Sequence, residues 1–156
     1  MEKTMLLGLV LFATMVVGAL FFCFKKTCHA TGGQTMTLTS KRFANQSRLP
    51  IDYTCEGKNI SPDLSWDNVP AGAQSLALIC DDPDAPSKTW VHWVIFNMPA
   101  TTKNLAEGIP TTPKLDDGSM QGKNDFGKIG YGGACPPPGH GTHRYLFKLY
   151  ALSSML

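Results

Sequence analysis

Residues 80–93, CDDPDAPSKTWVHW, place three carboxylates in one turn ahead of a histidine. Asp82 and Asp84 lie in that turn, His92 follows it, and a second histidine, His143, lies about fifty residues further on. A carboxylate that accepts a hydrogen bond from one ring nitrogen of histidine favours the imidazolium and directs the other N–H outward. The sequence therefore predicts a site in which the two aspartates orient the two histidines toward a small anion.

Two predicted strands carry these histidines together with aromatic residues. Side chains alternate between the two faces of a strand, so one face of each holds a polar aromatic pair followed by apolar residues. The two sets are Trp90, His92, Val94 and Phe96 in the first strand and His143, Tyr145, Phe147 and Leu149 in the second. We expect the two strands to be neighbours whose polar pairs converge over the core, with the Tyr145 hydroxyl as a further donor.

A loop rich in glycine and proline, GGACPPPGHGTH, leads into the second of these strands. Glycine lets a ligand approach the backbone closely, so the N–H groups of this loop are further candidate donors. The prolines at 136–138 are expected to stiffen one wall. With Trp90 as an apolar flank, these features predict a small pocket for a phosphate-like group.

Each feature also has a plain structural explanation. Asp-Asp-Pro-Asp is common in turns, and a strand histidine is more often structural than ligand-binding. His29 and His140 are expected at the surface.

A metal site made of His92, His143 and an aspartate has no supporting spacing, so no metal or cofactor is predicted.

A hydrolase is the weakest alternative. The sequence has no Gly-x-Ser-x-Gly segment, and Ser87 has no special context. Cys135, near His140 and His143, is the candidate nucleophile of a Cys–His pair. The prolines beside it suit a buried, unreactive wall equally well. We therefore expect a protein that is not an enzyme.

Turn residues separate predicted strands at intervals of roughly ten positions, which is typical of an all-β sandwich. The strand segments are MTLTS, LSW, SLALIC, WVHWVIFNM and RYLFKLYAL. Residues 101–141 predict a long loop region with at most one short strand, and loops of this length are usually functional. No amphipathic helix is predicted after residue 30. The expected architecture is one antiparallel β-sandwich domain over residues 36–156.

The first thirty residues differ in composition from the rest. Residues 5–24 are almost entirely apolar and have charged residues on both sides. The stretch suits either a signal peptide, with cleavage before Thr31, or a membrane anchor of about 20 residues. We expect an N-terminal hydrophobic helix within residues 1–30 and a linker at 31–35. The domain is then exported to the periplasm or the extracellular space, either released or membrane-tethered.

The net positive charge lies outside the predicted domain. Of 14 basic and 12 acidic residues, three basic and one acidic residue fall in residues 1–30, and residues 31–156 hold 11 of each. A neutral domain gives no bulk electrostatic support to nucleic-acid binding, so nucleic acid is not an expected partner.

Three of the five cysteines, Cys55, Cys80 and Cys135, lie in the predicted domain. Disulfides form readily in exported proteins, but an odd number leaves at least one cysteine unpaired or bridged elsewhere. The sequence leaves their pairing open. The absence of a Cys-x-x-Cys segment argues against a structural zinc site.

Four segments together resemble the phosphatidylethanolamine-binding protein (PEBP) family, in its bacterial and archaeal branch, which is called Raf kinase inhibitor-like. They are YTCEGKNISPDLSW, VPAGAQSLALICDDPDAP, TWVHW and GKIGYGGACPPPGHGTHRYLFKLYAL, and the resemblance covers about residues 36–152. It implies two antiparallel sheets in Greek-key order and a small anion pocket for phosphate-like groups or phospholipid headgroups. The pocket residues that it implies are Asp82, Asp84, Ala85, Pro86, Trp90, His92, Cys135, Pro136, His143 and Tyr145.

The resemblance also implies what the protein does. Family members are binding or inhibitory proteins that act on kinases or proteases. We expect a non-enzymatic binding protein for a phosphate-bearing small ligand or a phospholipid headgroup. The alternative is a kinase or protease inhibitor that acts through the rim loops at 101–141 independently of the pocket. Family chains continue past LYAL through a helix and a last strand, so the chain resembles a C-terminally truncated member.

Overall fold

The computed structural model describes residues 35–156 as a mainly β structure. Its elements are β1 (Thr37–Thr39), the 3-10 turn η1 (Ile51–Tyr53), β2 (Leu64–Asp67), β3 (Ser75–Asp82), β4 (Trp90–Pro99), β5 (Asn104–Leu105), β6 (Met120–Gln121) and β7 (Leu146–Leu152). The short turn η1 is the single helical element of the described residues. The five strand segments that the sequence predicted are therefore confirmed.

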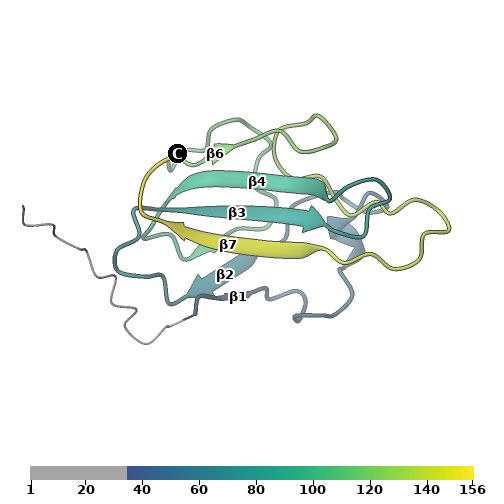
Figure 1. Cartoon of the computed structure of the whole chain (residues 1–156), viewed down its shortest axis with the longest axis horizontal. Helices are drawn as coiled ribbons and strands as arrows, with labels where there is room; N and C mark the ends of the chain where they lie inside the picture. Colours follow the sequence, from purple (N-terminus) through teal and green to yellow (C-terminus); the bar gives the residue numbers. More distant parts are fainter. Residues whose placement is uncertain (1–34) are drawn as a thin grey trace, which may run out of the picture. The chain divides into compact units, whose positions relative to one another are not determined.

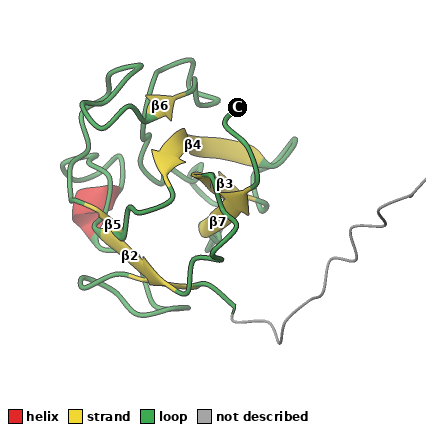
Figure 2. Cartoon of the chain, turned by 90° about the vertical axis from the view of Figure 1, so that its left-hand side faces the viewer, coloured by secondary structure: helices red, strands yellow, loops and turns green. Residues whose placement is uncertain are grey.

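The strands form two antiparallel sheets (Figure 1). One sheet has the order β1-β2-β5 and the other the order β6-β4-β3-β7. Seen end-on, β2 and β5 lie on one side and β4, β3 and β7 on the other, with the core between them (Figure 2). The predicted two-sheet antiparallel β fold is thus observed.

Apolar residues from both sheets fill the space between the layers. The large buried side chains are Trp66 and Leu64 from β2, Leu76, Leu78 and Cys80 from β3, and Trp93, Ile95 and Met98 from β4. The central strand β3 is buried on both faces along most of its length, which explains its continuous apolar run. Phe147 and Leu149 of β7 pack against this core, as their alternation predicted.

A β-bulge changes the alternation of β4. Cys80 pairs with Trp93, but the next residue, Asp81, pairs with Val91, so His92 is an extra residue without a direct partner on β3. A bulge brings two consecutive side chains toward one face, and His92 and Trp93 are both buried. The expectation that Val94 and Phe96 share the core face of His92 is therefore wrong, because the extra residue places Trp93 and Ile95 on that face instead. A second register shift, opposite Leu76 and Leu78, returns the buried Met98 to the core.

The region 101–141 is more ordered than its composition suggested. It contains the two short strands β5 and β6, where at most one was expected. The buried Gln121 side chain connects it to the core: Trp93 Nε1 donates to its Oε1 at 2.8 Å, and its Nε2 donates to the carbonyls of Pro110 and Thr112 at 2.7 and 2.9 Å. A fully satisfied buried polar group of this kind fixes the path of the surrounding loop.

The predicted N-terminal helix and all but the last residue of the predicted linker at 31–35 lie outside the described residues. Within residues 35–156, no helix is both long and apolar enough to span a bilayer.

Candidate functional site

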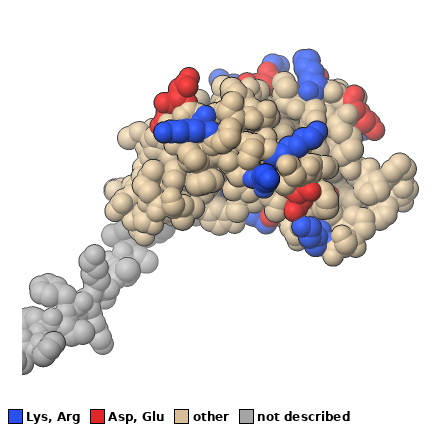
Figure 3. All heavy atoms as spheres, turned by 90° about the horizontal axis from the view of Figure 1, so that it is seen from above, with Lys and Arg blue, Asp and Glu red and all other residues tan. Residues whose placement is uncertain are grey.

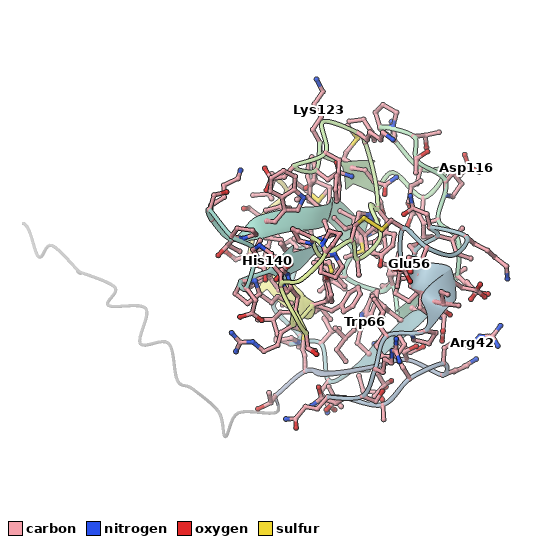
Figure 4. All side chains as sticks on the ribbon, turned by 90° about the vertical axis from the view of Figure 1, so that its right-hand side faces the viewer. Arg42, Glu56, Trp66, Asp116, Lys123 and His140 are labelled. Atoms are coloured by element: carbon pink, nitrogen blue, oxygen red, sulfur yellow. A yellow bond between two sulfur atoms is a disulfide. The ribbon has the colours of Figure 1, made fainter. Side chains whose placement is uncertain are left out.

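Three strand ends meet where the sequence placed its polar aromatic residues. Asp82 ends β3 and pairs with Trp90 at the start of β4, and Asp81 pairs with Leu146 at the start of β7. Extending that register by one residue places Tyr145 opposite Asp82. Strands β4 and β7 were expected to be neighbours. They are not, because β3 lies between them. Figure 4 views the molecule from this end of the sheet.

His143 and Asp82 form a buried pair. The ring nitrogen Nδ1 of His143 lies 2.7 Å from Oδ2 of Asp82, and both side chains are almost fully enclosed. The other carboxylate oxygen, Oδ1, accepts the backbone N–H of Asp84 at 2.8 Å. Asp82 therefore orients this ring, and Nε2 lies on the edge of the ring that points away from the carboxylate. The sequence predicted such contacts between the two aspartates and the two histidines without assigning which aspartate meets which histidine.

His92 is held by a backbone carbonyl and not, as expected, by a carboxylate. Its Nδ1 lies 2.7 Å from the carbonyl oxygen of Gly132, and the Gly132 N–H donates back to the His92 carbonyl at 2.8 Å. His92 is 3% exposed. Burial lowers the pKa of His92, and this effect exceeds the opposing influence of the Gly132 carbonyl and the Asp82 carboxylate. The bulge explains the difference, because it turns His92 toward the glycine loop.

Asp84 does not orient a histidine either. Its carboxylate accepts two hydrogen bonds from the guanidinium of Arg144, at 2.7 and 2.8 Å, and a third from the Arg144 backbone N–H at 2.9 Å. These bonds hold the pKa of Asp84 below its ordinary range. Asp84 therefore fastens the segment before β7 to the aspartate turn. The third aspartate, Asp81, pairs with Lys148 at 2.6 Å.

Two buried hydrogen-bonding groups at this site have no partner. They are the indole Nε1 of Trp90 and the hydroxyl of Tyr145. Burial raises the pKa of Tyr145 to about 12, so the phenol keeps its proton at neutral pH. Buried polar groups are nearly always hydrogen-bonded, so two unsatisfied groups in one small region mark it as the candidate binding site.

Sequence reasoning missed Phe126, which frames the site. Its ring lies 5.4 Å from that of Trp90 and 5.3 Å from that of His92, both edge-on. The side chain of Asn124 shapes this turn, since its Oδ1 accepts the N–H groups of Phe126 and Lys128. The segment Asn-Asp-Phe-Gly is a turn signal in the sequence, but nothing local shows that its aromatic ring returns to β4.

Cys135 is bonded to Cys55, which settles a pairing that the sequence left open. The disulfide is the yellow bond in Figure 4. Cys80 is the free cysteine of the described residues, and burial raises the pKa of its thiol. While the disulfide is intact, Cys135 is not a thiolate nucleophile, so the Cys–His pair considered for a hydrolase is not available.

The remaining residues implied by the resemblance lie around the rim. Ala85 is half-buried, and Pro86 and Pro136 are exposed, as is His140. The N–H groups of Gly132 and Gly133 are engaged with the His92 carbonyl and with Asn59 Oδ1, so these two are not the free donors that the glycine loop was expected to supply. A role for the rim residues in binding stays a prediction.

The wider surface adds little to this local chemistry. Basic and acidic side chains are interspersed on the face seen in Figure 3. Among residues 35–156, no cluster of three or more His, Cys, Asp or Glu is arranged to hold a metal ion. Hollows of about 240 and 420 Å³ lie elsewhere, beside Pro50 and beside Pro110. Neither hollow is lined by any of the candidate binding residues at the ends of β3, β4 and β7.

Comparison with known proteins gives consistent matches. Residues 39–156 match a family described as "Phosphatidylethanolamine-binding protein". The chain is similar to a UPF0098 protein of Methanothermobacter thermautotrophicus, at 58% identity over 121 residues that cover 78% of this chain and 79% of the relative. It is also similar to the UPF0098 protein YbhB of Escherichia coli, at 50% identity, with 75% and 78% of the two chains covered.

Two solved structures resemble the fold. One is YbcL of Escherichia coli, described as a new member of the mammalian PEBP family, with a TM-score of 0.72 and 41% identity over 76% of this chain and 77% of that one. The other is a putative phosphatidylethanolamine-binding protein homolog of Chlamydia trachomatis, with a TM-score of 0.70 and 40% identity over 80% and 79%.

Proposed function

The chain belongs to the phosphatidylethanolamine-binding protein family, and from this premise we propose that it is a binding protein and not an enzyme. Its two antiparallel sheets would follow the Greek-key order of that family and would hold a phosphate-like group, either free or in a phospholipid headgroup. The ligand would lie at the end of the β6-β4-β3-β7 sheet where β3 ends and β4 begins.

One observation carries this proposal. Trp90 Nε1 and the Tyr145 hydroxyl are buried donors without a partner. Two histidines of the same strand ends, His92 and His143, are buried as well. Tyr145 and His92 are in direct contact, with ring centroids 5.2 Å apart. Oxyanions accept several hydrogen bonds at once, so an oxyanion would satisfy donors that the protein leaves unpaired.

The roles of the residues follow from their partners. His143 presents Nε2 to the ligand, and the buried Asp82 both orients the ring and balances its charge when the ring is protonated. Trp90 and Tyr145 donate, and Phe126 closes one side. Asp84, Ala85, Pro86, Cys135 and Pro136 form the rim. Because the domain is neutral, selection of an anion depends on these local donors.

We propose further that the domain acts outside the cytoplasm. The disulfide between Cys55 and Cys135 supports this, because such bonds persist in oxidising compartments. The apolar segment 5–24 supports it as well.

The test is a titration of the full chain with phosphoethanolamine, followed by calorimetry and by amide NMR shifts. We expect shifts concentrated around residues 82–92 and 143–145. Asp82→Asn and His143→Gln should each weaken binding by roughly tenfold or more, since each removes a charge-assisted hydrogen bond. His140→Gln is the matched control, because His140 is exposed on the neighbouring loop and should bind as the wild type does.

Phosphoethanolamine binding that survives in both Asp82→Asn and His143→Gln would contradict this site.

The inhibitor alternative predicts a different pattern. A kinase or protease inhibitor that acts through the loops at 101–141 would keep its inhibition in both variants, while losing phosphoethanolamine binding.

A further inference from the structure

We propose that the disulfide between Cys55 and Cys135 controls ligand binding at this site: reduction of the bridge by a dithiol weakens binding while the fold persists. This regulation rests on the function proposed above. Its basis is the place of the bridge. Both cysteines are exposed, and the bond connects the loop between the two histidines of the site to a separate segment of the chain (Figure 4).

The loop that carries Cys135 contacts both histidines of the site. Before the cysteine, the carbonyl oxygen of Gly132 lies 2.7 Å from His92 Nδ1. After it, the loop ends at His143, whose Nδ1 lies 2.7 Å from Asp82 Oδ2. Cys135 therefore lies between the two points at which this loop positions a histidine.

The backbone of Cys135 also acts on Tyr145, which carries one of the buried groups without a partner. Burial raises the pKa of Tyr145 to about 12, and the Cys135 N–H opposes that rise. This N–H therefore lies near the phenol oxygen, although the phenol has no full hydrogen bond. A shift of Cys135 would change the surroundings of a proposed ligand donor.

The segment that follows Cys135 stands free of the rest of the domain. Residues 136–142 are all exposed. Within the described part of the chain their one hydrogen bond is internal, from the His140 N–H to the Pro137 carbonyl at 3.2 Å. A Cβ added to Gly139 or Gly141 would meet no atom within 4 Å. The bridge is thus the last attachment of this loop before His143.

Backbone hydrogen bonds secure the loop only as far as Ala134. The Cys55 N–H donates to the Ala134 carbonyl at 3.0 Å, and the Ala134 N–H donates to the Tyr53 carbonyl at 3.3 Å. These bonds do not need the disulfide, and the apolar core between the sheets does not include it. Reduction therefore frees residues 135–142 and leaves the fold in place. Ordering that segment again when a ligand binds costs conformational entropy, so the affinity falls.

The chemistry is thiol–disulfide exchange. A thiolate of the dithiol attacks one sulfur of the bridge, forms a mixed disulfide and releases the other cysteine as a thiolate. The second thiol of the reductant then closes its own disulfide and releases the first cysteine, so the protein gains two electrons and two protons that the dithiol loses. Cys80 takes no part, because it is buried and burial raises the pKa of its thiol. Ligand binding is then confined to oxidising compartments, in which such bonds persist.

The test titrates the full oxidised chain with phosphoethanolamine by calorimetry, before and after treatment with dithiothreitol. Alkylation mapping by mass spectrometry verifies that Cys55 and Cys135 are reduced, and an amide NMR spectrum verifies that the chain stays folded. We expect binding to be at least about tenfold weaker after reduction and to recover on reoxidation. Cys55→Ser, which leaves Cys135 in place, should bind as weakly with the dithiol as without it.

Two controls separate the bridge from other effects of the reductant. The double variant Cys23→Ser, Cys28→Ser removes the cysteines that precede the described residues, and it should respond to the dithiol as the wild type does. In this variant, a methylene group inserted between the reduced thiols of Cys55 and Cys135 closes the loop with a link that dithiols do not cleave. The crosslinked chain should bind phosphoethanolamine as the oxidised chain does, even with the dithiol present.

Equal affinity of the oxidised and reduced chains would overturn the proposal. So would a reduced chain whose amide spectrum collapses, because the bridge would then hold the whole fold and not the site. A crosslinked chain that binds as weakly as the reduced one would also contradict it, since closing the loop would not restore the site. If the oxidised chain does not bind phosphoethanolamine, the proposed function itself fails, which is a distinct result.

Discussion

At the scale of single residues, two histidines of the same site have different chemistry because their partners differ. His143 is bonded through Nδ1 to the carboxylate of Asp82. His92 is bonded to a carbonyl and enclosed by aromatic rings, which favours the neutral ring. The sequence identified both residues but left open which aspartate meets which histidine. It assigned a carboxylate to the second because it could not show which residue lies across from His92.

The lowered pKa of His92 predicts how stability depends on pH. The unfolded chain takes up a proton at His92 near pH 6.5, before the folded chain does, so the free energy of unfolding falls as pH decreases below about 6.5 toward the pKa of the folded protein. Urea unfolding between about pH 7.5 and pH 5 would measure this in the wild type and in His92→Gln. The loss should be smaller in the variant.

A matched variant is available for this measurement. His140 is exposed, and His140→Gln should follow the wild-type curve. If the His92→Gln curve ran parallel to the wild type over the whole range, His92 would titrate alike in both states and its assigned neutrality would be wrong.

At the scale of elements, the site depends on a bulge in β4 and on the glycine loop that crosses it. The bulge turns His92 inward, and Gly132 and Gly133 bring the loop close enough to receive it. Strand alternation alone gave the correct face for Trp90 and His92 but the wrong one for Val94 and Phe96. A bulge arises from how two strands pair, so the residue pattern of one strand alone does not predict it.

Gly133 offers a test of this close approach. A Cβ there would lie 2.7 Å from Asn59 Oδ1 and 2.8 Å from the backbone carbon of Thr54, so the loop would have to move. We expect Gly133→Ala to lower the free energy of unfolding by about 1–3 kcal/mol. Thermal or urea unfolding would measure this loss.

Gly72 is the control for this substitution. A Cβ at Gly72 meets no atom within 4 Å, so Gly72→Ala should change stability by no more than about 0.5 kcal/mol. Equal effects of the two substitutions would show that the close packing of the loop against Thr54 does not contribute to stability.

At the scale of the whole molecule, one disulfide connects the two segments that border the site. Cys55 and Cys135 are 80 positions apart, and backbone hydrogen bonds between Cys55 and Ala134 and between Ala134 and Tyr53 run beside the bridge. A crosslink over so long a separation restricts the unfolded chain strongly. It also fixes the start of the proline segment that leads to His143.

Removal of this bridge should therefore destabilise the fold. We expect the double variant Cys55→Ser, Cys135→Ser to lose about 2–4 kcal/mol in the free energy of unfolding. Adding a dithiol reductant should bring the wild type to the same value and leave the double variant unchanged. A wild type whose stability did not respond to the reductant, with complete reduction verified by thiol counting, would contradict this role.

The sequence by itself determined the strand segments, the two-sheet class, the family resemblance and the residues around which the site is built. These properties depend on local patterning and on residue type, which a single chain displays directly. The tertiary structure decided which partner each of these residues has. Strand β3 separates β4 from β7, Asp84 binds Arg144 and not a histidine, His92 faces Gly132, and Cys135 bonds Cys55. Each of these contacts joins residues far apart in sequence, so it depends on strand order, register and loop path, which no local pattern specifies.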